Sequence, residues 1–248
     1  MMKAINYYGN STLKFEEAPM PTAGPGEIVL KVMSATTCGT DLKRYKRGYR
    51  GDQEGQASVF GHECAGIVYE VGEGVTKFQV GERVVSHNSA PCNSCYWCKQ
   101  GQYSMCEDLV FAPGAWAEYR LIPAEIVKQN TFHMPDDMSY ALASIVEPMA
   151  CAVYNINEAD VRIEDVVAIN GAGPLGLGQI VAAKDRGAYV IVTDLSEFRL
   201  DCAKKLGADV CINIKEVDDQ VQAVIDATPD KRGADIAIDC TGLPEIWE

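Results

Sequence analysis

The feature that most constrains the fold of this chain is a glycine-rich turn in its second half. The turn follows an apolar run over 166–170 and opens a helical pattern over 174–186. Its residues are Gly171, Ala172, Gly173, Pro174, Leu175 and Gly176. In a G-x-G-x-x-G turn, the first glycine permits the tight bend, the second lets the backbone approach a pyrophosphate, and the third lets helix and strand pack closely. The segment predicts a dinucleotide-binding site at the positive end of a helix.

An acidic residue at the end of the next strand strengthens this prediction. Asp194 closes the apolar run 189–193 and lies 23 positions after Gly171. A carboxylate there accepts hydrogen bonds from the adenosine ribose and repels a 2′-phosphate, so we expect NAD rather than NADP. Arg199 is a nearby cation that weakens this preference. The alternative is a glycine-rich turn that binds no ligand.

Strand and helix patterns alternate through the rest of this half, which predicts a parallel α/β sheet. A helix face is expected from Leu195, Phe198, Cys202 and Leu206. Four strand-like runs occur, at 166–170, 189–193, 210–214 and 235–240. A complete dinucleotide-binding sheet has six strands in the order 3-2-1-4-5-6. We therefore expect residues 153–248 to form a Rossmann domain whose C-terminal half is missing.

Residues 1–152 have a different character, because short β-rich runs alternate with turns up to about residue 135. The runs are 27–32, 66–71, 83–85 and 116–122. They predict an all-β barrel or sandwich with long functional loops, among them a surface loop from Lys43 to Gln56. A helix over 139–157 follows. Its expected buried face consists of Leu142, Ile145, Met149 and Val153.

Four cysteines are crowded into one short segment, at Cys92, Cys95, Cys98 and Cys106. Four thiolates at such spacings can enclose one ion tetrahedrally and leave no open position, as a structural zinc site requires. An iron–sulfur cluster is the competing hypothesis, since similar spacings bind such clusters. Four reduced, unligated thiols are the third interpretation. We expect structural zinc.

A second set of candidate ligands lies outside this tetrad. His62 and Glu63 are adjacent, and Gly61 before them permits a backbone bend through which both side chains could meet one ion. Cys38 would add a sulfur ligand. Glu147 lies in an otherwise apolar stretch, where a carboxylate is costly to bury unless it is paired or bound to a metal. The alternatives are unrelated loop side chains for the adjacent pair, a core thiol at Cys38 and an exposed helix position at Glu147.

Composition limits the partners and the location of the protein. The chain has 248 residues, a formal net charge of −13 and ten cysteines. So acidic a chain is unsuited to nucleic acid or to an anionic membrane surface, and we expect neither partner. The N-terminus has no apolar segment of signal-peptide length, and the longest apolar region, 141–154, is too short to span a bilayer. These features, and cysteines clustered as for metal binding, predict a cytoplasmic protein.

Taken together, the motifs resemble those of the zinc-dependent medium-chain dehydrogenase/reductase family. The similar segments are 38–41, 61–63, the four cysteines of the tetrad, 147–148, and 171–176 with Asp194. The resemblance runs over the whole chain in the family's order. It implies a GroES-like β-barrel as the catalytic domain over 1–152, followed by the Rossmann domain.

The resemblance also implies a metal site. Cys38, His62 and Glu63 would hold a catalytic zinc, in addition to the structural zinc of the tetrad. Glu147 would be a fourth ligand or would act through water, since family members differ on this point. A glutamate at this position is similar to the polyol and threonine dehydrogenase branch, whereas other alcohol dehydrogenases carry cysteine there.

Two further residues are implicated by the resemblance. Thr40 matches the hydroxyl that passes the substrate's proton outward. Lys43 stands where relatives often carry a histidine that completes this relay, so the outer relay would run through water, the ribose or Lys43 itself. The family's C-terminal region is absent from this sequence. A full-length form is expected to be a homo-oligomer, either a dimer or a tetramer.

The predicted function is zinc-dependent transfer of a hydride from a secondary alcohol to NAD. The expected substrate is a small polar alcohol: a polyol, a diol, a sugar or a 3-hydroxy amino acid. One alternative is a quinone-reductase-like member of the same superfamily, which the metal ligands disfavour. The other is a catalytically inactive zinc- and nucleotide-binding fragment, which the missing C-terminal region favours.

Overall fold

The computed structural model describes residues 1–49 and 52–246, and the chain divides into two compact units, Met1–Glu147 and Pro148–Glu248. The strands are β1 Met2–Tyr7, β2 Leu13–Ala18, β3 Ile28–Ala35, β4 Ser58–Val59, β5 Cys64–Val71, β6 Arg83–Ser86, β7 Ser89–Ala90, β8 Val110–Phe111, β9 Tyr119–Ile122, β10 Thr131–His133, β11 Val166–Asn170, β12 Tyr189–Asp194, β13 Val210–Asn213 and β14 Ile236–Asp239. The α-helices are α1 Gly39–Arg47, α2 Tyr96–Lys99, α3 Ala124–Gln129, α4 Tyr140–Ala143, α5 Val146–Glu158, α6 Pro174–Asp185, α7 Glu197–Lys205 and α8 Gln220–Ala227. Two short 3₁₀ helices are η1 Tyr103–Met105 and η2 Pro244–Ile246. Among the described residues, no helix is both long and apolar enough to cross a bilayer.

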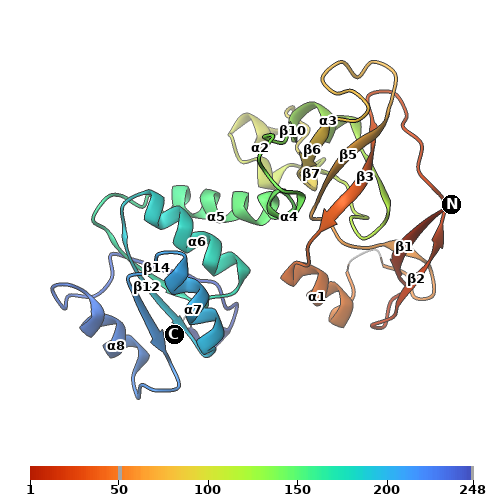
Figure 1. The fold of residues 1–248 in the computed structure, drawn as a ribbon. Coiled ribbons are helices and arrows are strands. Elements are labelled where there is room, and N and C mark those ends of the chain that lie inside the picture. Colours follow the sequence, from red (N-terminus) through yellow and green to blue (C-terminus); the bar gives the residue numbers. More distant parts are fainter. Residues whose placement is uncertain (50–51, 247–248) are drawn as a thin grey trace. The chain divides into compact units, whose positions relative to one another are not determined.

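The first unit is built from antiparallel sheets. A five-stranded sheet has the order β10-β6-β5-β3-β9, with β3, β5 and β6 side by side in Figure 1, and a three-stranded sheet has the order β2-β1-β4. Apolar side chains such as Ile28, Leu30, Val84 and Ile122 are fully buried between strands and loops and form the core. The all-β prediction for this half is confirmed.

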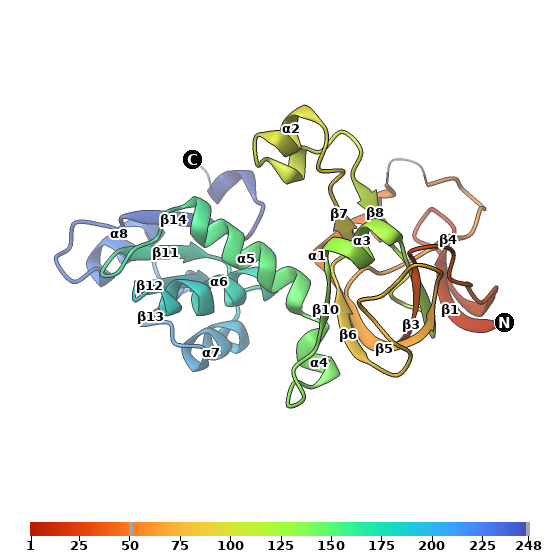
Figure 2. The same cartoon turned by 90° about the horizontal axis from the view of Figure 1, so that it is seen from above.

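The second unit is a parallel sheet with the order β13-β12-β11-β14, which the strand labels follow in Figure 2. Helix α6 packs on β11 and β12, and α7 packs on β12 and β13. The buried residues of β11 and β12 supply the centre of the core, because both are inner strands covered by other elements. Four parallel strands were predicted, and these four are found in the described part of the unit.

The predicted buried face of the 139–157 segment is wrong at two positions. Leu142 is 53% exposed and Val153 is 44% exposed. The segment is not one helix, because α4 ends at Ala143 and α5 starts at Val146, so the helical phase is reset between them. In α5 the buried residues are Ala152 and Ile156 instead, and a small side chain at Ala152 lets α6 approach closely.

The face predicted for the next helix is also wrong. Phe198 is 76% exposed, and the residues of α7 that enter the core are Leu200 and Ala203. Two sets of residues in this segment have helical spacing, one containing Phe198 and one containing Leu200 and Ala203. The second set faces the sheet, where the small side chain of Ala203 permits close contact between α7 and the strands. The loop expected over 43–56 is helical at its start, since α1 extends to Arg47. Its residues 50 and 51 lie outside the described part of the chain.

Candidate metal centres and nucleotide site

Cys38, His62 and Glu63 lie together in the first unit. Their sulfur, ring nitrogen and carboxylate oxygen atoms are all within 4.8 Å of one another. Cys38 is the N-cap of α1, and the adjacent pair joins β4 to β5. Sulfur, nitrogen and oxygen donors in one group suit zinc, and three protein donors leave a coordination position open for another molecule.

Gly61 makes this convergence possible. Its φ is +76°, and a Cβ atom built on it would lie 2.3 Å from Cδ1 of Trp116. The indole is fixed in turn, since its Nε1 donates a hydrogen bond of 3.1 Å to the carbonyl oxygen of Thr36. Glycine is therefore required at position 61 both for the backbone conformation and for space.

We expect Gly61→Ala to destabilise the protein by about 3 kcal/mol and to lower its zinc content, because the overlap with Trp116 must displace the His62–Glu63 segment. The matched control is Gly74→Ala, which has a similar φ of +81° but would place its methyl group in open space. The control should cost only about 1–2 kcal/mol. Thermal unfolding and metal analysis would check both values, and equal losses in the two variants would contradict the steric argument.

One carboxylate orients two of the candidate ligands. Oδ2 of Asp41 accepts the backbone N–H of Cys38 at 3.0 Å, and Oδ1 lies 3.0 Å from Nδ1 of His62. Asp41 is only 4% exposed. With Nδ1 hydrogen-bonded to this carboxylate, Nε2 of His62 presents its lone pair to an ion. This role of Asp41 was not predicted, although an acid three positions after a capping residue has the spacing of a capping box.

The surroundings of His62 favour positive charge. Burial by itself lowers the pKa of the ring, but hydrogen bonds and charges from Asp41 and Cys38 more than offset this and raise the pKa to about 10. A metal ion competes with a proton for the same nitrogen, so surroundings that attract the proton attract the ion as well. Glu63 is equally fixed, being 3% exposed and accepting a 2.6 Å hydrogen bond from the hydroxyl of Thr36.

Glu147 lies near this group but is not one of its three mutually close donors. Its Oε1 accepts a hydrogen bond of 3.0 Å from Nδ2 of Asn88 and lies 3.8 Å from Nε2 of His87. Burial raises the pKa of Glu147, His87 and His62 pull it down, and the charge of Glu63 raises it further. The carboxylate of Glu147 is therefore close enough to His62 and Glu63 for their charges to change its pKa.

Thr40 and Lys43 are both exposed on α1, three positions apart and therefore on neighbouring positions of one helix surface. The backbone N–H of Thr40 donates to the sulfur of Cys38, which places the hydroxyl-bearing residue directly beside a candidate ligand.

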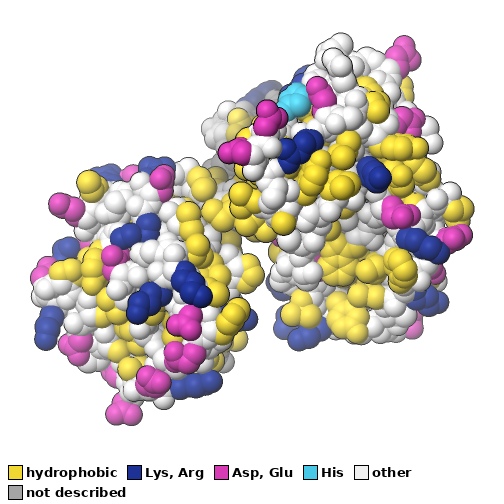
Figure 3. Space-filling view, in the orientation of Figure 1, with side chains coloured by type: hydrophobic (Ala, Val, Ile, Leu, Met, Phe, Trp, Pro, Cys, Tyr) yellow, Lys and Arg dark blue, Asp and Glu magenta, His cyan; other side chains and the backbone are white. Residues whose placement is uncertain are grey.

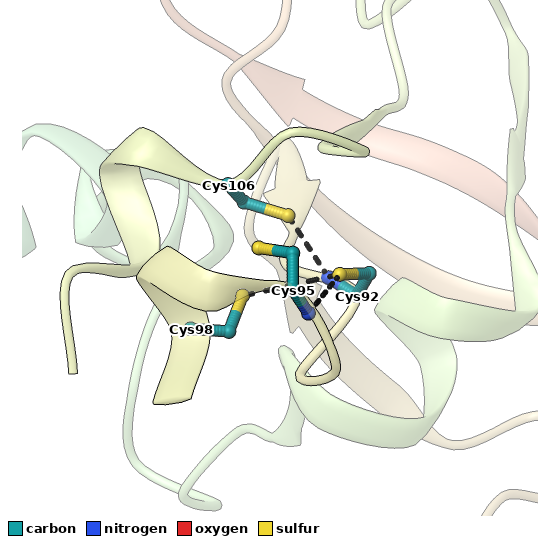
Figure 4. Close-up of side chains that lie close together, drawn as sticks. All are labelled: Cys92, Cys95, Cys98 and Cys106. Carbon is teal, nitrogen blue, oxygen red and sulfur yellow. Dashed lines mark hydrogen bonds between the residues drawn. The ribbon is translucent and has the colours of Figure 1, made fainter. Parts of the chain in front are cut away.

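The four cysteines of the tetrad form a separate group. Their sulfur atoms also lie within 4.8 Å of one another and face a common centre in Figure 4. The sulfurs of Cys92 and Cys98 are 4.0 Å apart, which is far longer than a disulfide bond. Hydrogen bonds from Ser94, from its hydroxyl and then its backbone, lower the pKa of Cys92 to about 6, while burial raises that of Cys98 to about 12. Four sulfur donors without another ligand type fit a closed zinc site.

A cavity of about 640 Å³ lies at the C-terminal ends of the parallel strands in the second unit. Gly171, Gly173, Asp194 and Arg199 line it, as do residues that were not predicted to belong to the nucleotide site. These are Asn170, Thr193, Leu195, Ser196, Glu197, Asn213, Ile214, Lys215, Gln220, Cys240, Thr241, Leu243 and Ile246. The carboxyl ends of parallel strands are where such sheets bind ligands. No sequence motif marks Lys215 or Gln220, because only the fold brings them to this edge.

The glycines of the turn have distinct structural roles. Gly171 has a φ of +96°, and a Cβ on Gly176 would lie 1.9 Å from the carbonyl oxygen of Gly171. A Cβ on Gly173 would meet no atom within 4 Å, so the backbone there is open to a ligand. Pro174 is the first residue of α6 and Leu175 the second, and neither they nor Gly176 belongs to the cavity lining among the described residues.

Asp194 is engaged by the turn itself. Its Oδ2 accepts the backbone N–H of Ala172 at 2.7 Å, and its Oδ1 accepts that of Ser196 at 2.9 Å. Nη1 of Arg199 lies 3.8 Å from Oδ2. Each carboxylate oxygen keeps one further lone pair for a ligand hydroxyl. Glycine cradle, carboxylate and cavity fit a dinucleotide.

Comparison with known proteins gives a consistent result. Residues 24–136 match the family model of the alcohol dehydrogenase GroES-like domain, and residues 174–248 match that of zinc-binding dehydrogenases. The chain is 36% identical to sorbitol dehydrogenase of Bacillus subtilis over 250 residues, covering 98% of this chain and 69% of the relative. It is 38% identical to L-threonine 3-dehydrogenase of Pyrococcus furiosus over 254 residues, covering 100% of this chain and 70% of the relative.

A solved structure agrees with these relatives. An oxidoreductase/dehydrogenase of unknown specificity from Escherichia coli has a TM-score of 0.89 with 32% identity, covering 98% of this chain and 71% of that one. Both domain types implied by the resemblance are therefore confirmed, a GroES-like domain followed by a Rossmann-type domain. The chain belongs to the zinc-dependent medium-chain dehydrogenase/reductase family.

Proposed function

We propose that this chain carries the active site of a zinc- and NAD-dependent dehydrogenase that oxidises a secondary hydroxyl group of a small polar alcohol. The single observation that carries the proposal is the open group of one sulfur, one nitrogen and one oxygen donor at Cys38, His62 and Glu63. The named relatives act on sorbitol and on L-threonine, which supports a polyol, a diol or a 3-hydroxy amino acid as the substrate.

The proposed mechanism assigns a task to each residue. Zinc held by Cys38, His62 and Glu63 would act as a Lewis acid that lowers the pKa of the substrate hydroxyl. Asp41 holds the proton on Nδ1 of His62, so that the ring keeps the tautomer that binds a cation. The hydroxyl of Thr40 would accept the substrate's proton while donating its own proton outward to a water molecule, and the exposed ammonium group of the neighbouring Lys43 could hydrogen-bond that water.

The cofactor is assigned to the cavity of the second unit. NAD would accept the hydride there, with its pyrophosphate against Gly171 and Gly173 at the start of α6. We propose NAD rather than NADP because the fixed carboxylate of Asp194 would repel a 2′-phosphate, although Arg199 and Lys215 reduce this repulsion. Residues 1–152 would form the catalytic domain and 153–248 the nucleotide domain.

Location and assembly are part of the proposal. We propose a cytoplasmic location, because four of the cysteines are grouped as metal ligands, a use of cysteine that suits a reducing compartment. We propose a dimer or tetramer, which sedimentation analysis would measure. Lys and Arg side chains are interspersed with acidic ones on the face drawn in Figure 3. This mixture of charges gives no reason to add a nucleic-acid or membrane partner, and the proposed partner is a small-molecule substrate.

The test is the rate of cofactor reduction with a panel of sorbitol, other polyols, vicinal diols and L-threonine, each with NAD and with NADP. We expect oxidation of at least one of these alcohols, with kcat/KM about tenfold or more higher for NAD, the effect of about 1.4 kcal/mol of charge repulsion. Absence of turnover with every alcohol, or turnover with a quinone in their place, would contradict the proposal.

A further inference from the structure

The carboxylate of Glu147 is held from the side by a residue that no family motif includes. Asn88 lies between β6 and β7, and its Nδ2 donates a hydrogen bond of 3.0 Å to Oε1 of Glu147. The backbone of Asn88 is fixed independently, because its carbonyl oxygen accepts the N–H of Ala112 at 2.8 Å. The backbone that carries this donor is therefore anchored to the first unit independently of the glutamate.

The same oxygen has a second neighbour on the same loop. Nε2 of His87 lies 3.8 Å from Oε1 of Glu147, and the backbone N–H of His87 donates to the carbonyl oxygen of Asn130 at 2.8 Å. The side chain of Glu147 is only 14% exposed, so little water competes for its oxygens. Hydrogen bonds to a buried charged group are among the stronger ones in proteins.

This restraint bears on the coordination of the metal. Cys38, His62 and Glu63 are mutually within 4.8 Å, and Glu147 is not a member of that close group. We infer that Asn88 is a positioning residue that keeps the carboxylate of Glu147 outside the Cys38–His62–Glu63 donor set, so that the fourth position stays available to the substrate. The inference rests on the proposed function, because it describes the same site.

The side-chain amide of Asn88 and the metal ion would therefore compete for the carboxylate of Glu147. When the hydrogen bond from Asn88 is removed, the carboxylate is free to turn towards the ion and become a fourth protein ligand. Four protein donors would then hold zinc more tightly than three, and a substrate hydroxyl would have to displace one of them before it could bind. The hydrogen bond thus favours substrate access over metal affinity.

The experiment compares Asn88→Ala with a matched control, Asn6→Ala. Asn6 makes the same type of hydrogen bond, from Nδ2 to Oε1 of Glu16 at 2.9 Å, in the same unit but on a strand that supplies none of the candidate ligands. We expect Asn88→Ala to bind zinc at the open site about tenfold more tightly in chelator competition, the size expected when a hydrogen bond to a charged group no longer competes with coordination. The visible spectrum of the Co²⁺-substituted protein should change with it, and Asn6→Ala should match the wild type in both measurements.

Kinetics provide a second readout. In Asn88→Ala the KM for the best alcohol of the panel should rise about tenfold while kcat changes by less than about threefold. Asn88→Leu keeps a similar side-chain size but removes the donor without adding charge, and it should act in the same direction if the alanine variant does not fold. In a Glu147→Gln background, Asn88→Ala should have no effect on zinc affinity.

Two outcomes would overturn the inference alone: unchanged or weaker zinc binding in both Asn88 variants, or an effect that persists in the Glu147→Gln background. A zinc content that is the same in the wild type and in His62→Ala would show that the open site holds no zinc, and it would overturn the proposed function and the inference with it. Comparing the zinc content of these two proteins therefore separates the two failures.

Discussion

Replacing His62 by alanine is expected to remove one of two zinc ions per chain and to lower kcat/KM for alcohol oxidation by about 10³-fold or more. The size follows from the several kcal/mol that a Lewis-acidic ion contributes to such a reaction, at about 1.4 kcal/mol for each factor of ten. His62 is the only nitrogen donor of the close group. Its loss leaves Cys38 and Glu63, two ligands instead of three.

The matched control for this prediction is Cys98→Ser, which removes one ligand from the closed tetrad. It should also lower the zinc content by one ion per chain, but its main effect should be on stability, because that site has no open position for a substrate. Zinc analysis and steady-state kinetics below the unfolding temperature would distinguish the two variants. Full activity of the His62→Ala protein would refute the assignment of the open site.

The second large effect is expected from Gly176→Ala. A methyl group there would lie 1.9 Å from the backbone carbonyl oxygen of Gly171, and neither α6 nor β11 can move away without loss of core packing. We expect a loss of about 3 kcal/mol, the upper end for an overpacked core. For a unit of about 100 residues this lowers Tm by about 12 °C or more.

The Gly173→Ala variant should change NAD binding while leaving the stability of the fold nearly unchanged. A Cβ on Gly173 meets no atom within 4 Å, and its φ of −71° suits alanine, so stability should change by about 1 kcal/mol or less. The methyl group would project where the backbone is open to a ligand, and NAD affinity should fall about tenfold or more. Calorimetry of both variants with and without NAD would test the pair. An intact Tm for Gly176→Ala would contradict the packing argument.

The architecture was predictable from the sequence because local patterns agree with the fold. The run 166–170, the glycine turn and Asp194 appear in the structure as β11, the start of α6 and the last residue of β12. The donor types suggested one set of candidate ligands, but only the family resemblance implied that they share one ion, since 23 residues of chain lie between Cys38 and His62. The fold then brings them within 4.8 Å of one another.

What the sequence did not predict depends on tertiary contacts. Phe198 and Leu200 both fit a helical stripe, and only packing against β12 and β13 decides which one is buried. Asn88 and Thr36 belong to no motif, and their roles follow from distances of 3.0 and 2.6 Å to Glu147 and Glu63. Residues that orient metal ligands cannot be predicted from a motif, because any side chain with a suitable hydrogen-bond donor can hold a ligand in place.

The two metal groups differ in a manner that physical chemistry connects with function. Four sulfur donors surround one point at the tetrad, so an ion there is shielded from any substrate. The open group has three donors, and its histidine and glutamate are each fixed by a hydrogen-bond partner, Asp41 and Thr36. A rigid, incompletely filled site is what binding and activation of an alcohol require.

The most direct test of the account is the metal dependence of NAD reduction in the wild-type protein. A brief treatment with chelator should remove one of two zinc ions per chain, because the ion in the open group is the more accessible one. Alcohol oxidation should disappear in proportion to that loss and return when Zn²⁺ is added back. Oxidation that survives removal of this ion would contradict the assignment of Cys38, His62 and Glu63 as the catalytic centre.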